Sequence, residues 1–506
     1  MKFGCGPNRT NLGNVYEVIE FPLREDLGWK CEQNPIINSS LHGRATQHKE
    51  HNGHMERREF LKLSALAGGS LIAADWLITT ELAQASSSEM VSANGLLKLK
   101  LIADERLIKY GSTTRWAMTY NGVFPAPTLR VKPGDTLQIS LVNKLSSPTN
   151  LHTHGLHTSP SGNGDNPLLM IKPGETFNYS IKIPMTQKSG TFWYHPHHHE
   201  LTAGQVASGL FGAIIVEDAL DSLPVIKNAT ERTLVLADPR IGKTSAVAAT
   251  SQMDLMHGRS GPNTLVNGIL VPKFIAVGNA PERLRIVNSC VSQYQTISMN
   301  GAQIWQLSSD SSRLSNPYKT TSVTLTPGQR TEILILAPKA GAYTLENAEQ
   351  PLAKFTYKSP SVQINASALL PFTPIRKVDK SRTIRVLGMG MGMMSGMAHE
   401  ASFTFDGKVF DANRVDQTVK FNSTEEWQIS NNSSMDHPFH LHVWPFQVAD
   451  DGSGNFLEGW HDTVNLPSGA TVKIRIPFKD ISGTTVYHCH ILDHEDAGMM
   501  GIVKVS

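Results

Sequence analysis

Residues 467–490 read PSGATVKIRIPFKDISGTTVYHCH, and this stretch decides the fold. Polar and apolar residues alternate with a period of two in TVKIRIPF, and a second run rich in β-branched and aromatic residues, GTTVYHCH, follows. Runs of this kind, bounded by Gly and Pro, are typical of half-buried strands. We therefore predict β-strands on both sides of the central turn.

Two further copies of this block occur upstream. KPGETFNYSIKIPMTQKSGTFWYHPH begins at Lys172, and TPGQRTEILILAPKAGAYTLEN begins at Thr326. A second block also occurs three times, beginning with NGVFPAP at Asn121, NGILVPK at Asn267 and DGKVFDA at Asp406. Repeated blocks with little helical signal predict three copies of one β-rich domain.

The repeats define the expected architecture. The prediction is an all-β chain of three consecutive Greek-key β-sandwiches. The expected domains are residues 94–228, 229–370 and 381–506, and the Pro-containing SALLPFTPIRKVDK links the second domain to the third. A chain of 506 residues is long enough for two to four domains. The formal net charge of +2 argues against a dedicated nucleic-acid surface.

The N-terminal region resembles a targeting segment. Residues 55–85 contain Arg57-Arg58, a weakly apolar run and an Ala-Gln-Ala site before Ser86, which resembles a Tat signal peptide. The alternative, a membrane anchor, is disfavoured because Gly68, Gly69 and Asp75 make the run short and poorly apolar. We expect export to the periplasm or outside the cell without stable membrane insertion. We interpret residues 1–54 as a non-native upstream extension, with translation starting at Met55.

Two cysteines then remain in the mature chain, Cys290 and Cys489. Because exported proteins often contain disulfides, a disulfide between these two cysteines is one interpretation. The surroundings of Cys489 favour another, because histidines flank it on both sides. Cys290 is expected to be a small buried apolar residue.

Histidines gather in four clusters: His152-Thr-His154, His195-Pro-His197, His437-Pro-Phe-His440-Leu-His442, and His488-Cys489-His490 followed by His494. The middle repeat ends instead in Tyr-Thr-Leu-Glu-Asn, so building this strand does not require histidine. In a strand, residues two apart share a face, so each His-x-His pair aims two imidazoles in one direction. Cys489 and His437 are an odd number of positions from the neighbouring histidines of their clusters, so they lie on the opposite side of the strand.

The clusters therefore predict two sites, back to back across one strand. One holds eight imidazoles, and the other holds Cys489, His437 and His494. Zinc binding or simple hydrogen bonding would explain a single His pair, but not four pairs with one around a cysteine. A His2Cys set with a weak axial Met is typical of a blue-copper electron-transfer centre. Met499 and Met500 both remain candidates for the axial position.

In order along the chain, HTHG, WYHPH, HPFHLH and HCHILDHEDAGMM make the sequence resemble a three-domain multicopper oxidase, the family of laccases, bilirubin oxidases and bacterial cuprous oxidases. The resemblance spans residues 94–506 and implies that the three sandwiches are consecutive cupredoxin-like domains that bind four copper ions. It assigns the type 1 copper to His437, Cys489, His494 and Met499, and the type 2 copper to His152 and His440. The type 3 pair takes six histidines: His154, His195, His197, His442, His488 and His490.

The resemblance also implies a reaction. Substrate gives electrons singly at the type 1 copper, and O2 is reduced to water at the trinuclear cluster of type 2 and type 3 coppers. Cys489 with His488 and His490 would carry the electrons between them. Asp165, in the loop GNGDN, and Glu495 resemble the proton-delivering carboxylates of the family, with Asp496 a weaker candidate. The alternative for these acids is an ordinary solvated loop.

The electron donor is less well defined. GMGMGMMSGMAH, residues 388–399, resembles the methionine-rich segment of cuprous oxidases, and thioethers favour Cu(I). Possible Cu(I) contacts are therefore six methionines: Met389, Met391, Met393, Met394, Met397 and Met435. A flexible loop or an adaptable apolar surface is the alternative. Phenolic or other aromatic donors stay open, and a monomer is expected. The rival functions are a copper nitrite reductase and a non-enzymatic exported interaction protein on the same scaffold.

Overall fold

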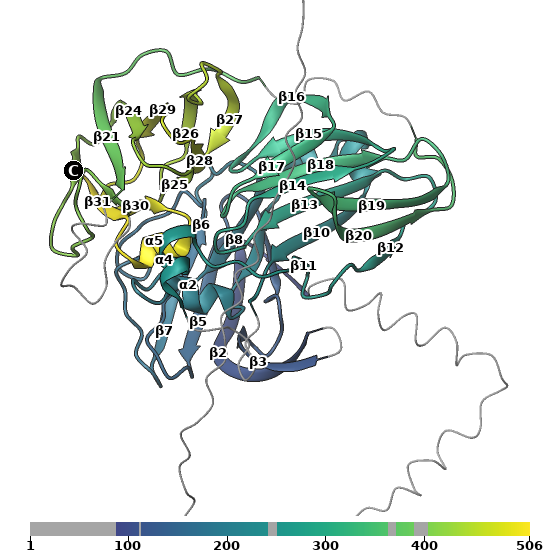
Figure 1. The fold of residues 1–506 in the computed structure, drawn as a ribbon, viewed down its shortest axis with the longest axis horizontal. Helices are drawn as coiled ribbons and strands as arrows, with labels where there is room; N and C mark the ends of the chain where they lie inside the picture. The colour runs from purple at the N-terminus through teal and green to yellow at the C-terminus, as the bar shows by residue number, and fades with distance from the viewer. Residues whose placement is uncertain (1–87, 111–112, 241–249, 363–370, 389–402) are drawn as a thin grey trace, which may run out of the picture. The chain divides into compact units, whose positions relative to one another are not determined.

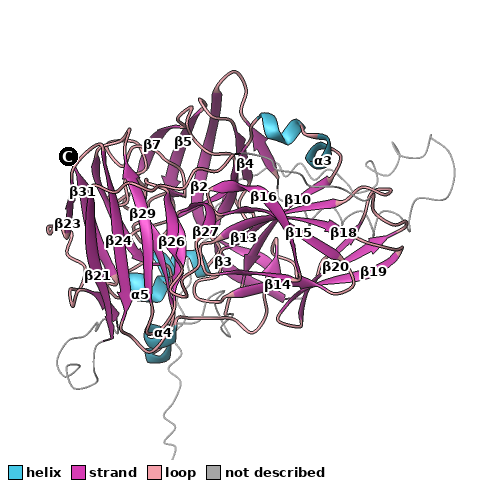
Figure 2. Cartoon of the chain, turned by 90° about the horizontal axis from the view of Figure 1, so that it is seen from above, coloured by secondary structure: helices cyan, strands magenta, loops and turns pink. Residues whose placement is uncertain are grey.

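The computed structural model describes residues 88–110, 113–240, 250–362, 371–388 and 403–506. The proposed extension 1–54, the Tat-like segment 55–85 and the methionines at 389–397 lie outside the described residues. Strands dominate the described part of the chain, and the helices are few and short (Figure 2). A search of that part for a helix long and apolar enough to cross a membrane finds none.

The described strands form six sheets, two in each third of the chain (Figure 1). The first third pairs a sheet of order β1-β4-β9-β8-β6 with one of order β3-β2-β5-β7. Its elements are β1 Glu89–Val91, β2 Leu96–Tyr110, β3 Thr113–Tyr120, β4 Thr128–Val131, β5 Thr136–Asn143, β6 His152–His154, β7 Thr176–Lys182, β8 Gly190–His195, α2 Thr202–Ala207, β9 Gly212–Val216, η1 Ala219–Ser222 and α3 Pro224–Lys227. The sandwich thus takes in a strand that precedes residue 94.

The second third pairs sheets of order β11-β10-β13-β18-β15-β16 and β12-β20-β19-β14-β17. Its elements are β10 Thr230–Ala237, α4 Gln252–His257, β11 Leu265–Val266, β12 Lys273–Ile275, β13 Glu282–Asn288, β14 Gln295–Met299, β15 Gln303–Ser309, β16 Ser312–Thr320, β17 Ser322–Leu325, β18 Arg330–Leu336, β19 Gly341–Asn347 and β20 Gln350–Tyr357.

The last third pairs sheets of order β22-β21-β24-β29-β26-β27 and β23-β31-β30-β25-β28. Its elements are β21 Lys380–Gly388, β22 Phe403–Phe405, β23 Gln417–Val419, β24 Ser423–Asn431, β25 His437–Leu441, β26 Phe446–Asp450, β27 Leu457–His461, β28 Thr463–Leu466, β29 Thr471–Phe478, β30 Gly483–Cys489, α5 Leu492–Asp496 and β31 Met500–Val505.

The three sandwiches share details that confirm the predicted repeat. In each sandwich a long strand near its start pairs in parallel with a later one, as β2 with β5, β10 with β13 and β21 with β24. Asn121, Asn267 and Asp406 all have positive φ and precede a glycine with positive φ. Two such residues in succession form the tight turn that suits the twist of a hairpin. The all-β prediction of three cupredoxin-like sandwiches is therefore confirmed.

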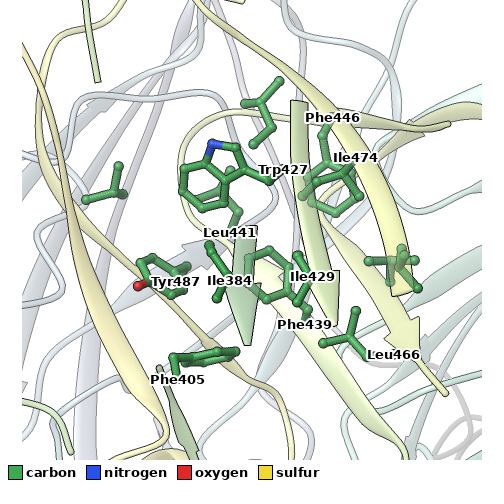
Figure 3. Close-up of a cluster of buried hydrophobic side chains, with 14 of the residues drawn as sticks. Ile384, Phe405, Trp427, Ile429, Phe439, Leu441, Phe446, Leu466, Ile474 and Tyr487 are labelled. Carbon is green, nitrogen blue, oxygen red and sulfur yellow. The ribbon is translucent and has the colours of Figure 1, made fainter. Parts of the chain in front are cut away.

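Alternation along the strands separates core from site. In β29 Val472, Ile474 and Ile476 are buried while their neighbours are only partly buried. In β25 and β30 Phe439, Leu441 and Tyr487 enter the apolar core of the last sandwich (Figure 3). Their chain neighbours are the histidines, so those side chains leave on the opposite face of the sheet.

Candidate metal centre

Two pairs of neighbouring strands carry the eight histidines. In the first sandwich β6 pairs with β8, so that His152 lies opposite His195. In the last sandwich β25 pairs with β30, so that His440 lies opposite His488. His197 and His490 follow directly after β8 and β30, and His442 follows β25. Each of these histidines is at least 98% buried.

The two sandwiches bring their histidines together. The ring of His152 stacks on that of His442, and the ring of His154 stacks on that of His440, each with centroids 3.8 Å apart. The Nε2 atom of His488 lies 3.1 Å from Nε2 of His197 and 3.1 Å from Nε2 of His442. Nitrogens bound to one ion at about 2 Å would have a similar separation, taking the zinc–imidazole distance as a guide.

The inward-facing nitrogens fit metal binding. Six of the rings have a buried nitrogen with no hydrogen-bond partner among the described residues: His152 Nε2, His154 Nδ1, His195 Nε2, His440 Nε2, His442 Nδ1 and both nitrogens of His490. Burial lowers the pKa of His197 and His490 to about 3. It also lowers the pKa of His154, His195, His440 and His442 well below the ordinary value. Neutral imidazole is the form that binds metals.

The two predicted acids are buried beside these rings, which excludes the solvated-loop alternative for them. Asp165 accepts from Nδ1 of His152 at 3.0 Å and from the amide and hydroxyl of Thr153. Glu495 lies 3.1 Å from Nδ1 of His488 and 3.5 Å from Nε2 of His197. Burial alone would raise the pKa of both acids, but the adjacent histidines lower it below the ordinary value.

A second, smaller set of ligand types lies on the core side of β30. Sγ of Cys489 is 3.5 Å from Nδ1 of His437 and 3.8 Å from Nδ1 of His494. All three side chains are buried. Burial raises the pKa of the Cys489 thiol and lowers the pKa of His437 to about 4 and of His494 to about 3. The thiol would therefore lose its proton only when a cation binds it.

The surroundings of Cys489 separate the two methionine candidates. Met499 belongs to the same buried cluster as Cys489, and its carbonyl accepts from the Cys489 amide. Met500 lies in a different cluster with Val486 and Ile502. Cys290 and Cys489 are both buried free thiols, which corrects the disulfide reading. Cys290 instead receives a hydrogen bond from the Gln295 amide inside the second sandwich.

Other histidines and aromatic residues lie near the two ligand sets. Trp444 and Phe446 are fully buried in the last core. His157 contacts the Val443 carbonyl through Nδ1, and the ring of His199 packs on Phe410.

Several neighbours of the site are not among the site residues predicted from the sequence. The indole of Trp193 stacks on His195 at a centroid distance of 4.2 Å. Phe403 packs its ring on both His437 and His494. Asp462, between β27 and β28, accepts a hydrogen bond from His154, and Arg330 of β18 pairs with Asp462. These contacts join residues that are far apart in the chain, so no spacing in the sequence could have identified them.

Comparisons with known proteins agree with this geometry. Models of multicopper oxidase domains match residues 102–221, 230–370 and 388–506. A multicopper oxidase, mco, of Staphylococcus haemolyticus is 34% identical over 399 residues, covering 76% of this chain and 83% of that protein. The solved structure of a Campylobacter jejuni multicopper oxidase, described as a metallo-oxidase, is 30% identical with a TM-score of 0.73, covering 83% of this chain and 95% of that one.

A more distant relative has a different role. The cell division protein FtsP of Proteus mirabilis is 26% identical over 423 residues, covering 76% of this chain and 84% of that protein. The domain models and the relatives together show that the chain belongs to the multicopper oxidase family. Membership supports oxidase activity and copper binding by the histidine clusters.

Proposed function

We propose that this protein couples four one-electron oxidations of a donor at a type 1 copper to the reduction of O2 to two waters at a trinuclear cluster. The type 1 ligands are His437, Cys489, His494 and Met499. The type 2 ligands are His152 and His440, and the type 3 ligands are His154, His195, His197, His442, His488 and His490. Bound copper would supply the one-electron chemistry, with four ions matching the four electrons that O2 requires.

One observation carries this proposal: Cys489 and His488 are adjacent in β30 but face different ligand sets. Cys489 lies opposite Phe439 on the core side, whereas His488 lies opposite His440 among the eight histidines. The chain from the Cys489 sulfur to the rings of His488 and His490 is therefore a short covalent path for electrons. The electron donor and O2 can therefore react at separate sites.

The acids have separate tasks. Asp165 accepts a hydrogen bond from Nδ1 of His152, which leaves the unpartnered Nε2 of the same ring directed inward. Glu495 lies between His197 and His488 at the edge of the cluster, where a carboxylate can pass protons to reduced oxygen. We assign both acids to proton delivery, and Asp165 also orients a ligand.

Copper content, the blue thiolate–copper absorption and O2 uptake with a phenolic dye test the proposal together. We expect four coppers per chain, a blue protein and O2 consumption without nitrite reduction. Cys489→Ser should lose the blue colour and turnover while its histidine cluster still binds copper. A colourless, copper-free wild-type protein would instead favour a scaffold role like that suggested by the FtsP name, and nitrite reduction would favour a nitrite reductase.

We further propose Cu(I) as a donor. The methionine-rich segment, residues 388–399, lies in the part of the chain that runs from Gly388 to Phe403. These two residues pair with one another, and the Phe403 ring packs on both type 1 histidines. The half-buried Met435 is two residues from His437, and its carbonyl accepts from Ser433, whose hydroxyl contacts Nε2 of His437. The similar Campylobacter enzyme is described as a metallo-oxidase.

Replacing Met389, Met391, Met393, Met394 and Met397 with leucine keeps length and apolarity but removes sulfur. Cu(I) oxidation should fall far more than oxidation of a small phenol. Met185→Leu, at a thioether that is 78% exposed in the first sandwich, is the matched control. Equal loss of both activities would argue against copper capture by these methionines.

The proposed location follows from residues 55–85. We propose Tat export and cleavage before Ser86, with the mature protein a monomer. N-terminal sequencing of the exported protein tests the cleavage site, and light scattering tests the oligomeric state.

A further inference from the structure

The second sandwich supplies none of the proposed ligands, yet one of its side chains pairs with Asp462, which lies beside the trinuclear site. Arg330, at the start of β18, is fully buried. Its Nη1 donates to Oδ1 of Asp462 at 2.8 Å, and its Nη2 donates to Oδ2 at 2.6 Å. This two-pronged geometry matches a planar guanidinium to a carboxylate. Asp462 itself belongs to the last sandwich, between β27 and β28.

Asp462 in turn holds two of the proposed ligands. Its Oδ1 accepts from Nε2 of His154 at 2.9 Å, and its backbone carbonyl accepts from Nδ1 of His440 at 2.8 Å. The opposite nitrogens, His154 Nδ1 and His440 Nε2, are the ones left without partners among the described residues. Asp462 therefore lies outside the ligand shell and determines which nitrogen of each ring faces inward. Outer partners of this kind fix ring orientation in metal sites.

The surrounding chain is shaped to admit this ion pair. Gly155, directly after His154, has φ +88°, and a Cβ there would lie 2.6 Å from Nη2 of Arg330 and 2.7 Å from Oδ2 of Asp462. The remaining Arg330 donors are used as well: Nε donates to the Thr191 carbonyl of β8, and Nη1 also donates to the Gly328 carbonyl. One side chain thus touches all three sandwiches. Lysine has no planar fork with which to make these contacts together.

We propose that Arg330 and Asp462 are positioning residues through which the ligand-free second sandwich holds His154 and His440 in register for copper. This inference rests on the proposed function, because it concerns the same trinuclear site. It gives the second sandwich a task in the chemistry without any ligand of its own.

Asp462→Asn and Arg330→Lys test the inference. Arg283→Lys is the matched control, because Arg283 is also buried but pairs with Glu332, whereas Arg330 pairs with Asp462, the residue that bonds His154. We expect both test variants to lose type 2 and type 3 copper affinity or O2 turnover by about 10–100-fold, as for other partners of metal ligands. Their type 2 electron paramagnetic resonance signal should change. The blue absorption, and its bleaching by a reductant without O2, should stay as in the wild type and the control.

The possible results separate the two proposals. A wild-type protein without copper would defeat the proposed function itself. A copper-loaded wild type whose Asp462→Asn and Arg330→Lys variants keep the type 2 signal, copper content and turnover would overturn the positioning role alone. If both variants also lost the blue centre, or failed to fold while Arg283→Lys folded, the pair would be a general stabiliser of the fold and the inference would equally be overturned.

Discussion

Adjacent residues in β30 serve different sites because a strand sends successive side chains to opposite faces. Cys489 enters the apolar core with Met499, and His488 faces the other histidines. Carboxylates then orient some of the rings from outside, as Asp165 does for His152. A carboxylate can only accept, so the Nδ1 of His152 must donate, and its Nε2 is left for the metal.

At the scale of single residues, we predict that two variants, Asp165→Asn and Glu495→Gln, lose O2 turnover but keep the blue absorption. Each removes a buried carboxylate next to the histidine cluster, and a lost proton-transfer group slows turnover by roughly 10²-fold or more. The blue absorption should not change, because neither acid contacts Cys489, His437 or His494 in hydrogen bonds or ion pairs given by the described structure. Steady-state O2 uptake and anaerobic bleaching measure the two effects. Asp480→Asn, at an acid that is 69% exposed, is the control, and wild-type turnover in both test variants would contradict the relay.

Among the elements, α5 is one that links all three sandwiches. This short helix packs against α2 of the first sandwich and α4 of the second (Figure 1). His494 and Glu495 belong to the two proposed metal sites, and Asp493 pairs with the Arg259 guanidinium at 2.6 Å. Asp496 accepts from the backbone amides of Thr202 and Ala203 at 3.0 and 2.7 Å. It therefore caps the N-terminus of α2 from another domain, which replaces the solvated-loop reading of this acid.

We predict that Asp496→Ala lowers the free energy of unfolding by about 0.5–2 kcal/mol, the usual effect of losing an N-terminal cap. Asp496→Asn should lose less, because burial and the adjacent Glu495 raise the pKa of Asp496 and so favour its neutral form, which an amide resembles. Denaturant unfolding of the copper-free variants measures both changes. A drop in O2 turnover with unchanged stability would show that Asp496 delivers protons instead.

On the scale of the whole molecule, buried ionisable groups make stability depend on pH. Burial raises the pKa of Asp238, after β10, to about 7, although the Gly261 amide donates to it. The folded state then holds a proton that the unfolded chain releases near pH 4. The contribution of this protonated side chain to the stability of the folded state is fully present below that pH and is lost as pH rises through about 7. Buried histidines with lowered pKa values, such as His437, act in the opposite direction. Their contribution to the stability of the folded state is lost as pH falls below the pKa of a histidine in the unfolded chain.

We predict that Asp238→Asn removes the pH-dependent contribution of Asp238 and leaves that of the buried histidines. The difference in unfolding free energy between the variant and the wild type should grow in favour of the variant as pH rises from about 4 to about 7, by roughly 4 kcal/mol at most. Denaturant titrations of copper-free protein at several pH values measure it. A difference that is independent of pH would show that Asp238 is ionised throughout this range.

The sequence by itself determined the three sandwiches and the grouping of histidines in pairs. Both depend on residues close in the chain: period-two alternation sets the faces of a strand, and Asn-Gly or Asp-Gly turns set its ends. Only the tertiary structure decided how the sites are completed. His154 and Asp462 are 308 positions apart, and Arg330 comes from a sandwich without ligands. Such contacts arise where sheets of different domains pack, and no local pattern in the chain encodes which side chains meet there.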